Sequence, residues 1–387
     1  SEAWVLWDSM RGIVDGGNDP FFEVNDSAAE NTFQNWITLT PTGFKLITAN
    51  NQVNQNNKDY IVTCIRRPDG YVGKPIETGT DAFTIDLVGV NSGDPSWVSD
   101  FPVDMQFIKD RSGTTYNFFL STRLTQGKYL STTSNAVEGS NAVYAHDYST
   151  GFGNYSAAAS DNITSFMWRR HKGFDVVAYK GTEIAGQGIA HSLSVVPEMM
   201  WVKRRSGSAE GWAVYHKGLN GGSSPEDWNL KLDEEAVEED TDSRWNDTAP
   251  TSTHFSLGVS GRVNTNNQDY IAMLFASVPG VSSVGYYSGN DSGQTITTGF
   301  QPRFVIIKQR SNAESWYMFD TVRGWSQNNQ DWFLRLDGPY AQSDHVNDRP
   351  DDIGHPVSTG FYLKGESGSD LNVTNKTGRN YVYYAHA

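Results

Sequence analysis

The chain reads PEMMWVKRRS at residues 197–206, PRFVIIKQRS at residues 302–311 and PVDMQFIKDRS at residues 102–112. Each version starts with proline, continues through a short apolar run and ends in Lys-x-Arg-Ser. A short apolar run of this kind is typical of a strand that is buried inside a β-sheet. The versions lie roughly 100 residues apart, which is the size of one β-sandwich of about seven or eight strands. We therefore expect one β-rich unit to recur along the chain.

Three further motifs recur in a fixed order: an aromatic strand, an alternating strand, and an Asn-rich turn that leads into a strand. Their copies lie at residues 4–12, 116–123, 212–216 and 316–324; at 19–25, 227–233 and 331–337; and at 53–61, 263–271 and 373–382. Self-similarity at a fixed spacing indicates tandem copies of one supersecondary unit. The sequence thus predicts an all-β chain of about four diverged, jelly-roll-like β-sandwich repeats. The predicted repeats are residues 1–70 (partial), 71–172 (the most diverged), 173–283 and 284–387.

The composition agrees with many short strands joined by turns. The 387 residues include 12 Trp, 18 Tyr, 19 Phe and 37 Gly, and aromatic residues favour strands while glycine favours turns. The formal net charge of −15 repels phosphate backbones and anionic lipids. We therefore expect neither nucleic acid nor membrane insertion. The acidic stretch 233–242 is expected to be a solvated face, and it is the one plausible helical piece.

The first copy has two unusual features. Cys64, the one cysteine, aligns with Leu274 of the third copy, so we expect a small buried hydrophobe there. No internal disulfide can form, which fits assembly in a cytoplasm. The copy also starts after the point where its Lys-x-Arg-Ser strand would lie. This predicts either that the N-terminus is processed or that another chain donates the missing strand.

No motif for catalysis or metal binding stands out. The 8 histidines form no H-x-H or H-E-x-x-H pair, and the chain has neither a Walker loop nor a G-x-S-x-G elbow. Carboxylate pairs such as Asp227 with Asp233 resemble those of glycosidases, but their recurrence favours a turn-capping role. We therefore predict a non-enzymatic protein without a cofactor. Calcium is a lesser alternative, at Asn290-Asp291 or at Asp348, Asp351 and Asp352.

The repeated motifs supply the remaining candidate residues. The basic pairs either present charge to an acidic glycan or bond carboxylates of their own unit, such as one near Asp320, and we favour the second interpretation. The recurring tryptophans also favour a structural role. These structural candidates are Lys109, Arg111, Lys203, Arg205, Lys308, Arg310, Trp4, Trp212 and Trp316. Aromatic residues that do not recur are better candidates for stacking on sugar rings, and we expect Trp97, Tyr286 and Tyr287 to contact a glycan.

The third copy carries a resemblance to a known family. The segments that carry it are 179–181, 197–205, 212–216, 245–252 and 269–276. In this combination the chain resembles the uncharacterised repeat domains of virion proteins from marine tailed phages, including cyanophages. The fourth copy matches well, and the first and second match in part. The resemblance implies a location in the virion and a role in adhesion or scaffolding, without known catalytic residues.

Three functions follow from these observations. The first is a phage virion structural protein of the tail, a tail fibre or the capsid surface, assembled in the host cytoplasm and active in host attachment. Its expected partners are other virion proteins and its own copies in a homo-oligomer. The alternative is a lectin-like chain that binds a host-surface glycan. A polysaccharide depolymerase is the least favoured.

Overall fold

The computed structural model of the chain describes residues 3–65, 76–87, 95–112, 117–153, 162–327, 331–342, 353–365 and 373–387. Almost all of the regular secondary structure in this part is antiparallel β-strand, which confirms the predicted all-β class. The one α-helix in the described residues is a single turn, α1 (Asp242–Trp245), at the end of the acidic stretch. Short 3₁₀ turns lie at Gly79–Asp81, Arg123–Thr125, Leu219–Gly222 and Pro225–Asp227. None of the described helices has the length and hydropathy to cross a membrane.

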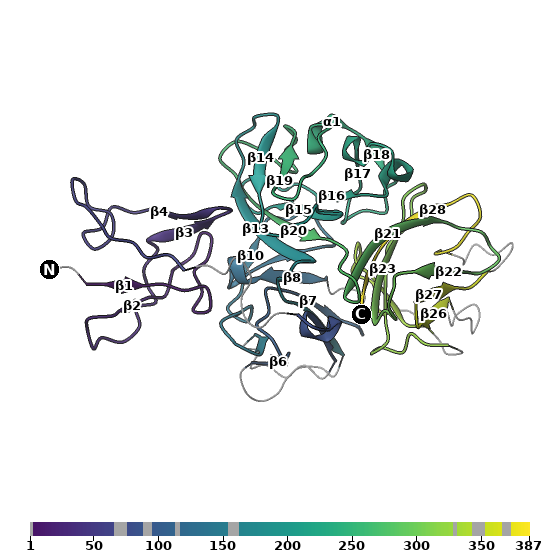
Figure 1. Cartoon of the computed structure of the whole chain (residues 1–387), viewed down its shortest axis with the longest axis horizontal. Coiled ribbons are helices and arrows are strands. Elements are labelled where there is room, and N and C mark those ends of the chain that lie inside the picture. The colour runs from purple at the N-terminus through teal and green to yellow at the C-terminus, as the bar shows by residue number, and fades with distance from the viewer. Residues whose placement is uncertain are drawn as a thin grey trace.

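Three larger antiparallel sheets form the body of the molecule (Figure 1). We call residues 76–168, 173–276 and 281–387 the second, third and fourth segments. The second segment has the strand order β10 (Gly139–Ser140), β9 (Lys128–Ser131), β8 (Phe119–Thr122), β7 (Met105–Asp110), β12 (Ile163–Trp168) and β5 (Phe83–Asp86). The third has β13 (Phe174–Lys180), β20 (Asp269–Phe275), β15 (Met199–Arg204) and β16 (Ala213–His216). The fourth has β21 (Ser282–Ser288), β28 (Asn380–His386), β23 (Phe304–Gln309), β24 (Trp316–Asp320) and β25 (Phe333–Arg335).

The three sheets place equivalent strands in equivalent positions. The Lys-x-Arg-Ser strands β7, β15 and β23 each lie between two antiparallel neighbours, one of which is the aromatic strand that follows. The other neighbour is the last strand of the segment, β12, β20 or β28. The predicted boundary between the third and fourth repeats, at residues 283 and 284, falls inside β21, which starts at Ser282. The fourth segment therefore starts slightly earlier than predicted, because its first strand directly follows the last strand of the third segment.

Three smaller sheets cover the outer faces of the larger ones. They are β11 (Gly151–Phe152) with β6 (Trp97–Val98); β14 (Gln187–Ala190) with β19 (His254–Leu257); and β22 (Gln294–Thr297), β27 (Gly360–Leu363) and β26 (Gly354–Val357). A further pair, β17 (Trp228–Asn229) with β18 (Glu239–Asp240), lies beside β16 at the edge of the third sheet, where Val214 of β16 bridges Leu230. Each segment has a separate core on this outer side. In β15, for example, Met200 and Val202 face the outer core of the third segment.

The inner faces of the three larger sheets meet in one shared core. Phe107 of β7 stacks on Trp201 of β15 with ring centroids 5.8 Å apart. Phe275 contacts Tyr384 at 5.0 Å, and Phe83 contacts Phe304 at 4.9 Å. Each segment therefore packs against both of the others. This arrangement explains why the Lys-x-Arg-Ser strands are apolar on both faces: both are covered. Separate sandwiches in a row, as the sequence suggested, would leave the inner faces without this common core.

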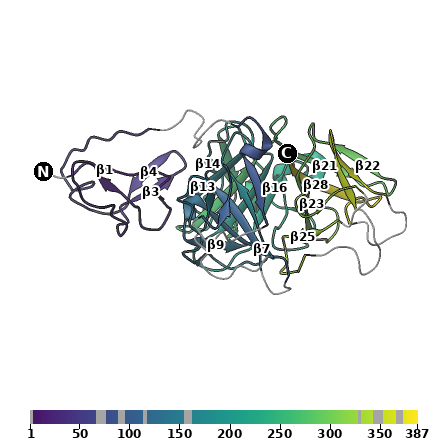
Figure 2. The ribbon, with the colours of Figure 1, turned by 90° about the horizontal axis from the view of Figure 1, so that it is seen from below.

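The first segment, residues 3–65, lies at one end of the molecule (Figures 1 and 2). It contains two hairpin-like pairs, β1 (Val5–Leu6) with β2 (Phe22–Glu23) and β3 (Ile37–Thr40) with β4 (Gly43–Leu46). Its small core holds Phe21, Trp36 and Val53. Residues 59–65, expected to be a strand, have no regular secondary structure. Cys64 is exposed, so the prediction of a buried hydrophobe is wrong: the strands that flank Leu274 have no counterpart beside Cys64 among the described residues.

Candidate functional site

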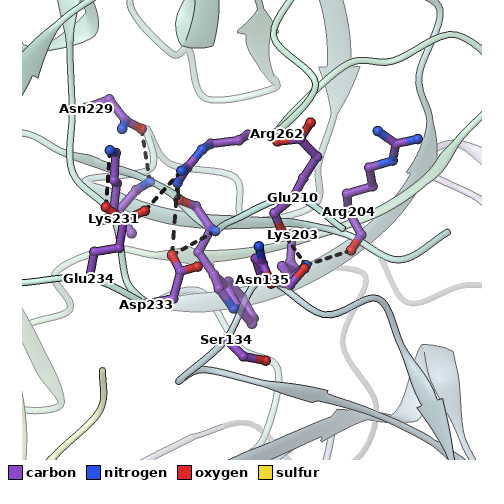
Figure 3. A network of polar contacts seen from close by, with 12 residues as sticks. Ser134, Asn135, Lys203, Arg204, Glu210, Asn229, Lys231, Asp233, Glu234 and Arg262 are labelled. Atoms are coloured by element: carbon purple, nitrogen blue, oxygen red, sulfur yellow. Dashed lines mark hydrogen bonds and ion pairs between the residues drawn. The ribbon is translucent and has the colours of Figure 1, made fainter. Parts of the chain in front are cut away.

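The repeated lysines are buried near the C-terminal ends of their strands. Lys109, Lys203 and Lys308 are all 0% exposed. The Nζ atom of Lys203 donates to the carbonyl oxygens of Arg204 at 3.2 Å and Glu210 at 2.6 Å, and to that of Asn135 in the second segment at 3.1 Å (Figure 3). Burial lowers the pKa of each of the three lysines to about 8. A lysine held in this way has its donors directed at the protein itself.

The repeated arginines join one segment to the previous one. The backbone N–H of Glu138 donates to the carbonyl of Arg205 at 3.1 Å, and its carboxylate accepts from Arg205 Nε at 2.7 Å. In the same way, the N–H of Glu238 donates to the carbonyl of Arg310 at 2.9 Å, and the two side chains form an ion pair. The expectation of a carboxylate within the same unit is wrong here, since both carboxylates belong to the neighbouring segment.

A third junction closes the three segments into a ring. The backbone N–H of Gln342 in the fourth segment donates to the carbonyl of Arg111 in the second at 2.9 Å. Thr132 Oγ1 donates to the carbonyl of Leu336 at 2.7 Å. The Arg111 side chain bonds the carbonyl of Asn162 in its own segment at 3.0 Å. Each of the second, third and fourth segments is thus bonded to both others, and we call this body the three-segment ring.

Two of the recurring tryptophans strengthen the same junctions. Trp212 Nε1 donates to the carbonyl of Ser131 at 2.8 Å, and Trp316 Nε1 donates to the carbonyl of Lys231 at 2.8 Å. In both cases the acceptor lies in the previous segment. Trp4, the matching residue of the first segment, is 61% exposed. Trp212 and Trp316 thus have a structural role at the junctions, whereas Trp4 forms no such junction with any of the described residues.

Sequence reasoning missed the carboxylates of these junctions. The stretch 233–242 was expected to be solvated, but the side chains of Asp233 and Glu238 are 5% and 11% exposed. The carboxylate of Glu235 in the same stretch accepts from Ser315 Oγ at 3.1 Å, and its backbone carbonyl accepts from the N–H of Glu314 at 2.9 Å. A glutamate recurs at positions 138 and 238, and each copy precedes a strand that carries the basic pair. This recurrence is the signal from which the junction carboxylates could have been predicted.

The first segment is tied to the ring through Arg205 as well. Arg205 Nη1 forms an ion pair with Asp15, and Nη2 donates to the Asp15 carbonyl at 3.0 Å. The backbone N–H of Asp15 also donates to the carbonyl of Leu124 at 2.8 Å. Arg205 therefore connects the first three segments.

Of the three candidate glycan contacts, only Tyr286 presents a ring to solvent. Trp97 is 0% exposed and stacks on Phe152 at 5.0 Å. Tyr287 donates its hydroxyl to the carbonyl of Thr374 at 2.6 Å, and its ring stacks within the outer core of the fourth segment. Tyr286 is 47% exposed, and its ring lies against Gly218 of the third segment, where an added Cβ would come within 2.6 Å of the ring.

The carboxylates that resembled a glycosidase pair have backbone partners. Asp233 Oδ1 accepts from the N–H of Trp212 at 3.0 Å, and Asp337 Oδ1 accepts from the N–H of Trp316 at 3.1 Å. Burial raises the pKa of Asp337 to about 6, against the effect of these hydrogen bonds. Equivalent positions in two segments thus perform the same structural task, which is to hold the start of the aromatic strand.

The described residues contain no group of three or more His, Cys, Asp or Glu side chains that could hold a metal ion. Asn290 uses its side-chain oxygen to accept from Ser292 N at 3.0 Å and from Asn375 Nδ2 at 3.3 Å. The other candidate calcium loop, Asp348, Asp351 and Asp352, lies outside the described residues.

Most of the three-segment ring, from the residues between β7 and β8 onward, is also what the comparison with protein families finds. A family described as a domain of unknown function, DUF7483, matches residues 114–387. The chain belongs to this family. The DUF7483 match includes both partners of the first two junctions and the Thr132–Leu336 contact of the third, but it begins after Arg111 and leaves out the first segment. Comparison with curated proteins and with solved structures finds no match.

Proposed function

We propose that the chain is a non-enzymatic structural protein of a phage virion, located in the tail, a tail fibre or the capsid surface. The observation that carries the proposal is the use of the repeated charged residues. A binding or catalytic site would need charged side chains of this kind. Here Lys203, Arg205 and Arg310 instead bond residues of the neighbouring segment and so join the segments. The resemblance to phage repeat domains supplies the location.

The ring is rigid, which is the property that a structural role in a particle requires. Its segments share one core, so no segment can tilt against another without disrupting close-packed aromatic side chains. The net charge of −15 keeps the surface soluble. Other virion proteins and further copies of the chain, in a homo-oligomer, are the partners that follow from this role, and assembly takes place in the host cytoplasm.

Purified particles test the proposal. Virions are banded on a density gradient, and the chain is quantified by mass spectrometry against the major capsid protein. A fixed ratio that survives a salt wash is the expected result. Presence in the infected-cell lysate together with absence from washed particles would overturn the proposal.

Glycan binding is the second candidate function, and the exposed ring of Tyr286 favours it. Aromatic faces that are held flat against the protein suit stacking on a sugar ring. A glycan array with the whole chain should then show binding that Tyr286→Ala abolishes. Tyr340→Ala is the matched control, because Tyr340 is another exposed tyrosine of the fourth segment. Release of new reducing ends from the bound glycan would instead indicate a depolymerase.

A further inference from the structure

Three polar side chains lie in the outer core of the second segment at positions that are apolar or aromatic in the other two segments. Gln106, Ser121 and Ser165 are at most 1% exposed, and they face outward, because a strand neighbour of each belongs to the shared core. By the register of the sheets, their counterparts are Met200, Tyr215 and Ala272 in the third segment and Val305, Phe319 and Tyr383 in the fourth. All six counterparts belong to hydrophobic outer cores. A buried polar group is costly unless it is hydrogen-bonded, so the second segment needs partners here that the other segments do not need.

Two of these side chains belong to a chain of hydrogen bonds that starts at a backbone carbonyl. His146 Nδ1 lies 3.1 Å from the carbonyl oxygen of Val103, and His146 Nε2 lies 2.8 Å from Ser121 Oγ. Gln106 Nε2 lies 2.7 Å from the same hydroxyl oxygen. Burial, together with the nearby charge of Arg123, lowers the pKa of His146 to about 3. The imidazole ring is therefore neutral at neutral pH and carries a proton on one nitrogen.

The carbonyl of Val103 fixes the direction of every bond in this chain. A carbonyl oxygen can only accept, so the proton of His146 is on Nδ1, and Nε2 accepts from the hydroxyl of Ser121. The Ser121 oxygen then accepts in turn, which requires the amide nitrogen of Gln106 to face it. Gln106 Oε1 is therefore the open end of the chain, and an amide oxygen can only accept.

Two buried oxygen atoms at this end of the chain have no hydrogen-bond partner among the described residues. They are Gln106 Oε1 and Ser165 Oγ. Gln106 lies opposite Met167 of β12, and Ser165 is two residues before Met167 on the same face of the sheet. Diagonal neighbours of this kind lie roughly 7–8 Å apart, which a long side chain and one small bridging molecule can span. The two oxygen atoms are thus placed to share one partner.

The chemistry of the two oxygen atoms selects a small neutral molecule that both donates and accepts. Gln106 Oε1 accepts only, so it repels an anion. Arg123 donates to the backbone carbonyl of His146, and its positive charge disfavours a cation beside the same hydrogen-bond chain. A water molecule meets the requirement, since buried waters bind to polar groups that otherwise lack partners and need two to four of them.

We propose that the outer core of the second segment is a binding site for one internal water molecule, which bridges Gln106 Oε1 and Ser165 Oγ. We call this molecule the bridging water. It donates to the amide oxygen and accepts from the serine hydroxyl. The chain of hydrogen bonds then runs from Val103 through His146 to β8, β7 and β12 and ties the three strands together across their outer face. The site does not depend on the function proposed for the whole protein.

Magnetic relaxation dispersion of the solvent water counts long-lived internal waters in the whole chain. Gln106→Met and Ser165→Ala each introduce the residue of the third segment, and each removes one partner of the bridging water. Each variant should hold about one long-lived water fewer than the unaltered chain. The double variant should also lose about one, because both replacements act on the same molecule. Ser99→Ala is the matched control, since Ser99 is 4% exposed and its hydroxyl already donates to the carbonyl of Phe101 at 2.6 Å; its count should not change.

Urea unfolding of Ser165→Ala is a second measurement that does not count waters. The midpoint should fall, because the bridging water loses its donor and Gln106 Oε1 loses a well-held partner. Removal of a hydroxyl that bonds nothing would instead raise the midpoint. A raised midpoint, an unchanged water count in Gln106→Met, a loss of two waters in the double variant, or an equal loss in Ser99→Ala would each overturn the inference.

Discussion

Replacement of Glu238 by glutamine should destabilise the protein far more than the same replacement of Glu30. The side chains of Glu238 and Arg310 are 11% and 10% exposed, and their ion pair joins the third and fourth segments. Removal of one partner leaves a buried charge unpaired, which costs about 3–5 kcal/mol of unfolding free energy. Glutamine keeps a hydrogen-bond acceptor, so we expect a value of about 3 kcal/mol. Glu30 pairs with Arg11 at 3.5 Å in the first segment, and both are partly exposed; such pairs contribute about 0–1 kcal/mol.

Urea unfolding, followed by tryptophan fluorescence, measures both variants. Arg310→Met and the double variant with Glu238→Gln complete a double-mutant cycle. We expect the double variant to be clearly more stable than the sum of the two single losses predicts, because the second replacement removes the charge that the first left unpaired. Equal losses in Glu238→Gln and Glu30→Gln, or strict additivity in the cycle, would refute the assignment of this ion pair as a junction.

Three further predictions concern individual side chains. Trp316→Phe should lower the unfolding free energy by about 1–3 kcal/mol in the same assay, because the partly buried carbonyl of Lys231 in the third segment loses its donor; an unchanged value would show that the hydrogen bond is dispensable. Burial, with the Arg123 charge, lowers the pKa of His146 to about 3, so the folded state binds fewer protons than the unfolded state below pH ~6.5 and stability falls as the pH drops towards 3. His146→Gln should reduce this loss by up to about 1.4 kcal/mol per pH unit in urea titrations between pH 4 and 6. Gly324→Ala should cost about 1–2 kcal/mol, because Gly324 has a φ of +107° and the nearest atom to an added Cβ is at an ordinary 3.6 Å; Gly43→Ala is the control, since its φ is not positive.

The local structure was predictable because it depends on residues close together in the sequence. The Asn-rich turn is the clearest case: Asn57, Asn267 and Gly378 adopt φ values of 60°, 58° and 77°. These residue types tolerate the left-handed region, and they lie at matching positions of the motif. The tyrosine three residues later then bonds the turn through its hydroxyl.

The shared core could not be predicted from the same motifs. The run Met199–Val202 indicates that both faces of β15 are buried, but it does not say what covers each face. The inner face meets side chains such as Phe107, which lie about 100 residues away in the sequence. A sandwich would satisfy the same pattern, so the sequence alone could not distinguish separate sandwiches from a ring.

In the candidate site, too, local features were predictable and contacts between segments were not. Recurrence predicted a structural role for Lys203 and Trp316, and the structure buries both side chains and bonds them to backbone carbonyls. Recurrence did not reveal that their partners lie in the neighbouring segment. The converse inference, that a residue which does not recur is free to bind a ligand, is weaker: Trp97 does not recur, yet its ring fills the outer core of the second segment.

The third junction, between Gln342 and Arg111, changes how the protein responds to a pull. In an open row of three units the end units have one neighbour each, and they fray first. In the ring each segment has two neighbours, so detaching any one of them requires two junctions and a share of the common core to fail together. A load applied to one segment is thus spread over the whole body, and a protease that nicks a surface loop does not by itself release a segment.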